Sequence, residues 1–301
     1  YSPIKYWPTA VGDKISFFAY APMVAESNKS FTLSDNTKTG TPTINVTYPT
    51  DLTNMVDLVA GVAMNKTKAK GNATEDVVTF TLKHEMSRVG ISAKVDKAIY
   101  DANNAANKTF VVIKSVKFDK AANDGQFYTS ATYTFSNEND KNGSWNTANA
   151  TKANADVDLS ALLNTETVKA TDAKVGTKYN TGVTGIKLSE KDQKVSLFKA
   201  DNYLFLIPVF ATTQTENNSI KATATISYDI VTEDSKLADG YSCTSATKTV
   251  SLPAGTLVQG KAYDYVFIIK LDEVKLSATV TDWDTATDAN VDVNYTDTDV
   301  K

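Results

Sequence analysis

The sequence predicts an all-β fold. Short runs of Val, Ile, Phe and Tyr are separated by stretches of Thr, Asn, Asp, Ser and Lys, and β-branched and aromatic residues favour strands. No window carries a sustained apolar stripe at the 3.6-residue period of a helix. Several apolar runs alternate strictly with polar residues, which is typical of sandwich strands that bury one face.

Strands are predicted along the whole chain, at residues 14–20, 43–48, 56–62, 76–82, 88–95, 109–118, 127–135, 203–210, 219–230, 247–252, 262–270 and 274–283. The alternation is clearest in 219–230, where one face carries Ile220, Ala222, Ala224, Ile226 and Tyr228. Residues 204–207 are apolar on both faces and predict a central, buried strand. Pro208 ends this run or places it beside a bulge, because proline cannot donate to a ladder.

Three polar stretches, residues 101–108, 137–156 and 165–194, are predicted to be surface loops. A domain boundary is predicted at 66–75, which contains no large apolar residue. This divides the chain into residues 1–75, residues 76–284 and a C-terminal segment, 285–301. Because so few strands precede residue 66, we expect the first domain to lack its N-terminal strands.

The C-terminal segment has the pattern of a lone strand. After Trp283, residues 285–288 form a polar break without the Asn-Gly or Asp-Gly signal of a tight hairpin. The next residues alternate, with one face made of Ala289, Val291, Val293 and Tyr295. A strand without a local partner leaves its backbone groups and apolar face in water, so this one must pair elsewhere in its own chain or in another molecule.

Composition and charge exclude several classes of partner. The 301 residues carry a net charge of -4, and Arg88 is the only arginine among 31 basic residues, so the chain is not expected to bind nucleic acid. No run approaches the roughly 18 apolar residues of a membrane helix. The single cysteine, Cys243, excludes an internal disulfide.

No residue pattern indicates catalysis, a metal or a cofactor. His84 is the only histidine, lies between two predicted strands and is interpreted as a structural residue. Motifs of serine hydrolases, zinc proteases and phosphate loops are absent. The sequence leaves one alternative open, a glycoside hydrolase whose two catalytic carboxylates converge only in the fold. We therefore predict a protein that is not an enzyme. Trp145, in a polar stretch, is the candidate for a surface contact, as with a glycan.

Four stretches in this order resemble the fimbrillin family of Bacteroidetes. YSPIKYWP at 1–8 and KISFFAYAP at 14–22 look like the family's late first-domain motif. VTFTLKHEMSRVGISAKV at 78–95 is similar to the opening of its second domain, LPAGTLVQGKAYDYVFII at 252–269 to a Gly-Lys-x-Tyr step, and LSATVTDWD at 276–284 to the closing strand.

The resemblance implies two transthyretin-like β-sandwich domains in tandem and export to the cell surface through a lipoprotein precursor. It also implies a pilus at the outer membrane, with other pilin subunits as partners. In that scheme the C-terminal strand of one subunit fills a groove in its neighbour, and the segment after Trp283 is where this chain would carry it. A shaft or anchor-proximal subunit is therefore expected. The alternative is a surface lipoprotein or tip adhesin of the same fold that binds a host glycan or protein.

Overall fold

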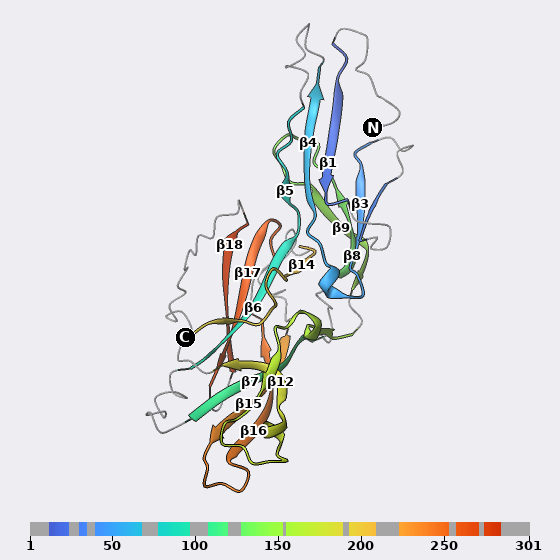
Figure 1. The fold of residues 1–301 in the computed structure, drawn as a ribbon. Coiled ribbons are helices and arrows are strands. Elements are labelled where there is room, and N and C mark those ends of the chain that lie inside the picture. Colours follow the sequence, from blue (N-terminus) through green and yellow to red (C-terminus); the bar gives the residue numbers. More distant parts are fainter. Residues whose placement is uncertain are drawn as a thin grey trace, which may run out of the picture.

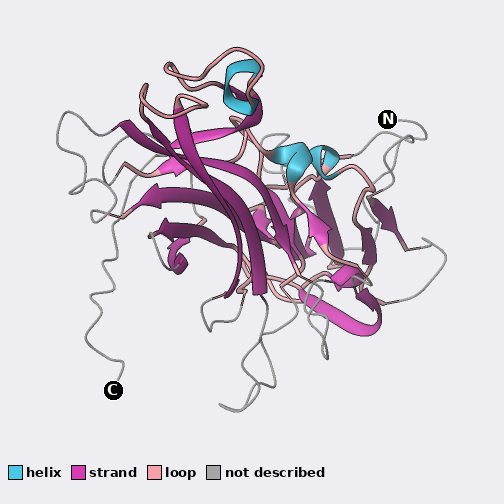
Figure 2. Cartoon of the chain, turned by 90° about the horizontal axis from the view of Figure 1, so that it is seen from below, coloured by secondary structure: helices cyan, strands magenta, loops and turns pink. Residues whose placement is uncertain are grey.

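Nearly all the regular structure is β-sheet, which confirms the predicted fold class (Figure 2). The computed structural model describes residues 12–23, 30–34, 40–67, 78–96, 108–119, 128–152, 155–188, 193–208, 223–252, 257–270 and 274–283. Helical structure in these residues is limited to short turns: η1 (Leu52–Asn54), η2 (Ser160–Leu162) and α2 (Lys178–Thr181). None of these helices is long and apolar enough to cross a membrane.

The first lobe, in the upper part of Figure 1, consists of two sheets. One has the order β1-β4-β5, formed by β1 (Ile15–Ala21), β4 (Val59–Lys66) and β5 (Lys83–His84). The other has the order β2-β3-β8-β9, formed by β2 (Phe31–Leu33), β3 (Thr43–Thr47), β8 (Tyr128–Thr134) and β9 (Ser144–Lys152). Side chains from both sheets share one core, which includes Ile44, Val46, Leu58, Ala60, Met86, Ala131 and Tyr133.

The first lobe takes strands from both sides of the predicted domain boundary. β5 pairs with β4, and β8 pairs with β3 through five registered residues, Thr43 to Thr47. The division into 1–75 and 76–284 stays a prediction, as does the expected lack of N-terminal strands. The first lobe therefore includes residues well beyond 76, because β8 and β9 supply half of its second sheet.

The second lobe also consists of two sheets. One has the order β11-β12-β7-β15-β16, with β10 beside β7, and its strands are β7 (Lys108–Phe118), β10 (Val157–Asp158), β11 (Glu166–Val168), β12 (Val183–Leu188), β15 (Thr223–Glu233) and β16 (Tyr241–Ser251). The other has the order β13-β6-β17-β18, with β14 beside β6, and its strands are β6 (Ser87–Val95), β13 (Val195–Ser196), β14 (Leu204–Leu206), β17 (Lys261–Ile269) and β18 (Val274–Asp282).

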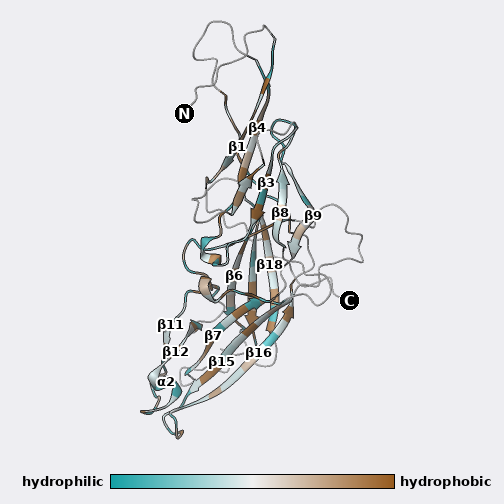
Figure 3. Cartoon of the chain, turned by 90° about the vertical axis from the view of Figure 1, so that its right-hand side faces the viewer, coloured by the Kyte–Doolittle hydropathy of each residue, from teal (hydrophilic) through white to brown (hydrophobic). Residues whose placement is uncertain are grey.

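The core of the second lobe lies between these sheets. Along the strands, hydropathy changes from residue to residue, as expected for sandwich strands (Figure 3). In β15 the predicted face is confirmed for Ala224, Ile226 and Tyr228, which are almost completely buried. Ile220 and Ala222 lie outside the described residues. β17 pairs with β18 in antiparallel and with β6 in parallel orientation.

Two predicted loops contain regular structure instead. β9 lies within 137–156, and β11, α2 and β12 lie within 165–194. The second stretch covers the outer face of its sheet, where Val168 and Tyr179 pack against Phe110 and Val112 of β7. β11 has only three residues, and β9 consists mostly of Asn, Ala, Thr, Ser and Lys, so neither sequence contains a continuous apolar run. Conversely, the predicted strand at 76–82 was wrong for its described part, since 78–82 form no strand.

Residues 204–207 are buried, but not as a central strand. β14 pairs only with β6 among the described strands, on the side opposite β17. Leu204 and Leu206 enter the core of the second lobe, whereas Ile207 enters the core of the first. The apolar residues on both faces therefore reflect a position between two cores.

Leu206→Ala should lower the free energy of unfolding by about 2 to 5 kcal/mol, because it leaves a cavity in a packed core. Chemical denaturation of the purified protein measures this. Val175→Ala is the control, since Val175 is 95% exposed and surface substitutions usually stay within about 0.5 kcal/mol. Equal stability of the two variants would show that β14 is peripheral.

Candidate functional site

The predicted donor strand lies outside the described residues. Ala289, Val291, Val293 and Tyr295 belong to residues 284–301, so their role stays a prediction. The structure does describe Trp283, the half-buried residue that follows β18 and from which this segment starts. The described part of the candidate site therefore consists of Trp283 and the residues that contact it.

Trp283 lies among aromatic and cationic side chains from three strands. The indole stacks on the His84 ring at 3.8 Å between centroids and 8° between planes, and it lies nearly parallel to Phe205 at 5.6 Å. The Arg88 guanidinium carbon is 5.2 Å from the indole centroid, within the range of a cation–π contact. The backbone N–H of Trp283 donates to the Gly260 carbonyl at 3.0 Å. We call Trp283, His84, Arg88 and Phe205 the Trp283 clamp.

The side chains of the clamp are themselves held in place. His84 Nδ1 lies 2.5 Å from Asp57 Oδ2, which fixes the ring plane. Arg88 also lies over the Tyr203 ring, 4.6 Å from its centroid. Burial raises the pKa of the Asp57 carboxyl, and the contact with His84 opposes this shift. His84 thus belongs to strand β5 and contacts a carboxylate and an indole. Among the described residues, no group of three potential metal-binding side chains occurs.

The clamp lies beside the segment that joins the two lobes. Residues 84–87, which we call the crossing segment, lead from the end of β5 in the first lobe to the start of β6 in the second. Its hydrogen bonds reach both lobes: Glu85 N to Leu58 O at 2.8 Å, Trp145 Nε1 to Glu85 O at 2.7 Å, Gly260 N to Met86 O at 3.0 Å, and Ser87 Oγ to Val258 O at 2.8 Å. Backbone and side chains together fix this segment.

Glu85 places a carboxyl group inside this junction. The residue is 1% exposed, and its carboxylate accepts a hydrogen bond from the Gln259 amide. Burial raises the pKa of Glu85 from 4.5 to about 7, while hydrogen bonds from Gln259 and Tyr133 oppose the shift. Desolvation outweighs these hydrogen bonds and the charge of Lys83, and the charge of Asp57 adds to the upward shift. No sequence pattern marks Glu85 as buried, since a Lys-His-Glu run looks like an exposed turn.

Trp145 lies in strand β9 and not in a polar loop, contrary to prediction. The side chain is half-buried, its ring meets Tyr133 edge to face at 5.5 Å, and its indole N–H donates to Glu85 O. A role as a surface contact stays a prediction, but the polar atom of the indole is already used within the chain. The Asn- and Ala-rich surroundings of Trp145 concealed the strand.

Among the described strands, β1 is an edge strand of the first lobe. In its sheet of described strands, β1 pairs with β4 on one side and lies at the edge on the other. Every residue of β1 is half-buried. Phe18 and Tyr20 pack against the core of the first lobe, and Phe18 meets Phe135 edge to face at 5.4 Å. Such an edge, next to an apolar core, can accept a further strand.

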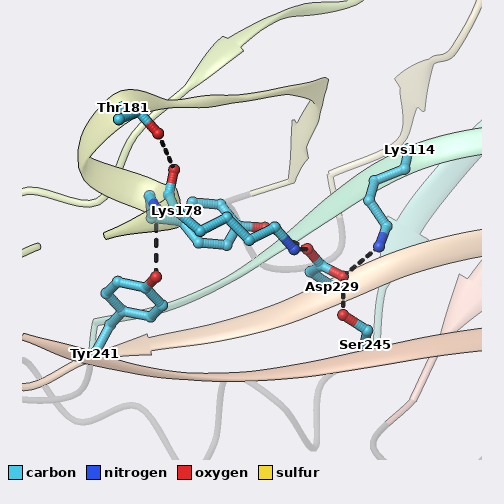
Figure 4. Close-up of polar contacts among 7 residues, drawn as sticks. Lys114, Lys178, Thr181, Asp229, Tyr241 and Ser245 are labelled. Carbon is cyan, nitrogen blue, oxygen red and sulfur yellow. Dashed lines mark hydrogen bonds and ion pairs between the residues drawn. The ribbon is translucent and has the colours of Figure 1, made fainter. Parts of the chain in front are cut away.

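A second charged cluster lies in the other lobe, on β15 (Figure 4). Asp229 is completely buried, and Lys114 and Lys178 approach its two oxygens at 2.6 and 2.7 Å. Tyr179 and Ser245 donate further hydrogen bonds to it. Burial raises the pKa of Asp229, but these donors outweigh burial and hold it far below the usual range. The carboxylate is fully satisfied, so this cluster anchors α2 to the sheet and offers no reactive group.

The two lobes and the junction between them define a two-lobed, all-β protein. No family model matches the chain. Over 308 residues it is 28% identical to the fimbrium subunit Fim1C of Phocaeicola vulgatus, a match that covers 97% of this chain and 74% of that protein.

A solved structure shows the same relationship. The crystal structure of a fimbrial protein from Bacteroides vulgatus ATCC 8482 is similar, with a TM-score of 0.74 and 25% sequence identity. The match covers 94% of this chain and 81% of that one. The predicted resemblance to the fimbrillin family is therefore confirmed.

Glu85 should make the stability of the protein depend on pH. Between about pH 4.5 and 7 the folded chain retains a proton that the unfolded chain has lost, so the free energy of unfolding falls as the pH rises through this interval. Glu85→Gln keeps the shape and removes the titration. Between pH 4.5 and pH 8, the free energy of unfolding of this variant should rise by on the order of 3 kcal/mol relative to that of wild type.

Denaturation curves at several pH values measure this effect. Glu166→Gln, at an exposed position in β11, is the control and should follow the wild-type profile. A constant difference between Glu85→Gln and wild type at every pH would contradict the assignment.

Asp229→Ala should destabilise the second lobe by about 2 to 4 kcal/mol, because it leaves two ammonium groups and the Tyr179 hydroxyl without their acceptor. Thermal and chemical unfolding measure the loss. Asp156→Ala is the control, since the ion pair between Asp156 and Lys117 is exposed, and it should leave the unfolding midpoint nearly unchanged. Similar midpoints for both variants would show that the buried cluster adds no stability.

Proposed function

We propose that this chain is a structural, non-catalytic subunit of a bacterial surface pilus. The observation that carries the proposal is the similarity to a fimbrium subunit over 97% of this chain. The similar fold of a fimbrial protein supports it. The proposal places the protein at the cell surface, in the outer-membrane fimbriae of a bacterium, after export as a lipoprotein precursor.

We further propose that assembly occurs by donor-strand exchange. Residues 289–295 would pair in trans with a sheet edge of a neighbouring subunit, and Ala289, Val291, Val293 and Tyr295 would fill its pockets. Two observations support this: the alternating pattern of the segment and the edge position of β1 beside the core of the first lobe. A subunit with such a tail can donate as well as accept, which favours a shaft or anchor-proximal position.

Chain length limits how far apart two subunits can be. Only residues 284–288 separate Trp283 from Ala289. An extended chain spans at most about 3.3 to 3.6 Å per residue, so the two α-carbons can be no more than roughly 20 Å apart. The acceptor edge of one subunit must therefore begin close to Trp283 of the next, and the two subunits must be in direct contact.

Val291→Asp combined with Val293→Asp should abolish polymerisation and leave the monomer folded, because it places two charges in apolar pockets. Gel ladders and electron microscopy of the purified subunit measure assembly, and circular dichroism measures folding. The matched control is Asn290→Asp with Asn294→Asp, which adds the same two charges on the opposite face of the strand and should still polymerise.

Deletion of residues 284–301 tests the same proposal without new charges. Continued polymerisation of the shortened chain would disprove donor-strand exchange through this segment. Loss of folding would show instead that the segment completes its own subunit.

A further inference from the structure

We propose that the Trp283 clamp sets the position and direction in which the C-terminal segment leaves the subunit, so that Trp283 is a positioning residue for assembly. This inference rests on the proposed donor-strand exchange. It concerns the donor subunit only: the clamp would determine how well a subunit presents its own tail, and not how well it accepts the tail of a neighbour.

The contacts of Trp283 exceed what the end of an edge strand needs. β18 is at the edge of its sheet in the described chain, and its register with β17 already ends at Asp282, opposite Lys261. One residue further, the indole is stacked on His84 and lies beside Phe205. These rings come from β5 and β14, so the end of β18 is fixed to the first lobe as well as to its own sheet.

The surroundings of the clamp leave the indole little freedom. Asp57 holds the ring of His84, and Arg88 lies between the Tyr203 and Trp283 rings, within 4.6 and 5.2 Å of their centroids. The backbone of Trp283 is tied to Gly260, whose own N–H is bonded to the crossing segment. Both the ring and the backbone of Trp283 are therefore held.

Fixing Trp283 favours assembly through entropy. A free tail loses conformational freedom when it binds, and every residue that becomes ordered adds to this loss. If Trp283 were also free to move, the donor strand would sample a much larger volume, and its effective concentration at the neighbour's groove would fall. When Trp283 is fixed, the length of residues 284–288 alone limits the volume in which the donor strand can meet its acceptor. The clamp thus pre-organises the donor.

The first experiment measures the polymerisation rate of the full chain with single substitutions. Trp283→Ala should slow ladder formation at least about tenfold, since it releases the root of the tail. Trp283→Phe keeps a ring against His84 and should recover most of the rate. Val280→Ala, on the same strand at a 43% exposed side chain, is the control and should polymerise like wild type.

The second experiment separates donating from accepting. The acceptor is the full chain with Val291→Asp and Val293→Asp, with or without Trp283→Ala, and the probe is a synthetic peptide of residues 285–301. The peptide should bind both acceptors with equal affinity. A positioning role predicts this combination of slow donation and unchanged acceptance, whereas general damage to the fold would lower both.

The outcomes distinguish the two proposals. A wild-type polymerisation rate for Trp283→Ala would disprove the positioning role of the Trp283 clamp and would leave the proposal of donor-strand exchange unaffected. A parallel loss of peptide affinity would also overturn it, because the substitution would then act through the fold. If the wild-type chain neither polymerised nor bound the peptide, donor-strand exchange would fail, and the positioning role would fail with it.

Discussion

The arrangement of the two lobes depends on a four-residue crossing, residues 84–87, that ties their two cores together. Residues 84–87 leave the sheet of the first lobe and enter the sheet of the second without a loop between them. Met86 is buried in the first core, whereas Val89, three residues later, is buried in the second. Because the segment is short and is hydrogen-bonded to Leu58, Trp145 and Gly260, a rotation between the lobes would strain these bonds.

The two buried carboxylates show how neighbouring charges determine the cost of burial. At Glu85 the charge of Lys83 and two hydrogen bonds do not offset burial, which raises the pKa to about 7. Asp229 has two lysines within 2.7 Å, and its pKa is lowered. Glu85 therefore favours the fold at acidic pH, whereas Asp229 requires its ionised form and loses its contribution only when acid protonates it. The junction and the distal cluster respond to acid in opposite directions.

Sequence reasoning succeeded where local pattern determines structure. The strict alternation around Ala224, Ile226 and Tyr228 predicted β15, and the Val/Ile/Tyr content of 262–270 predicted β17. It failed where pairing with distant residues stabilises a weak strand. β9 is rich in Asn and Ala, and it forms a strand because β8 pairs with it and Tyr133 packs against Trp145. Nothing in the local sequence shows this.

The candidate site was predicted only in part, for the same reason. Trp283 was expected to end a strand, and it follows β18 directly. Its neighbours His84 and Phe205 are far away in sequence, so no spacing rule could bring them together. The lone histidine was interpreted as a structural residue of a turn, and the structure shows a strand residue that supports an indole.

The stacking of Trp283 on His84 also determines how the subunit would carry a mechanical load. In a fibre joined through C-terminal strands, tension on one subunit is transmitted at Trp283. Because Trp283 is fastened to Gly260 and rests on β5, the pull is passed to the crossing segment and from there to both lobes. An unsupported end would instead let β18 peel from β17, one hydrogen bond at a time. The clamp distributes the force over many bonds at once, so tension would load the body of the subunit before its edge.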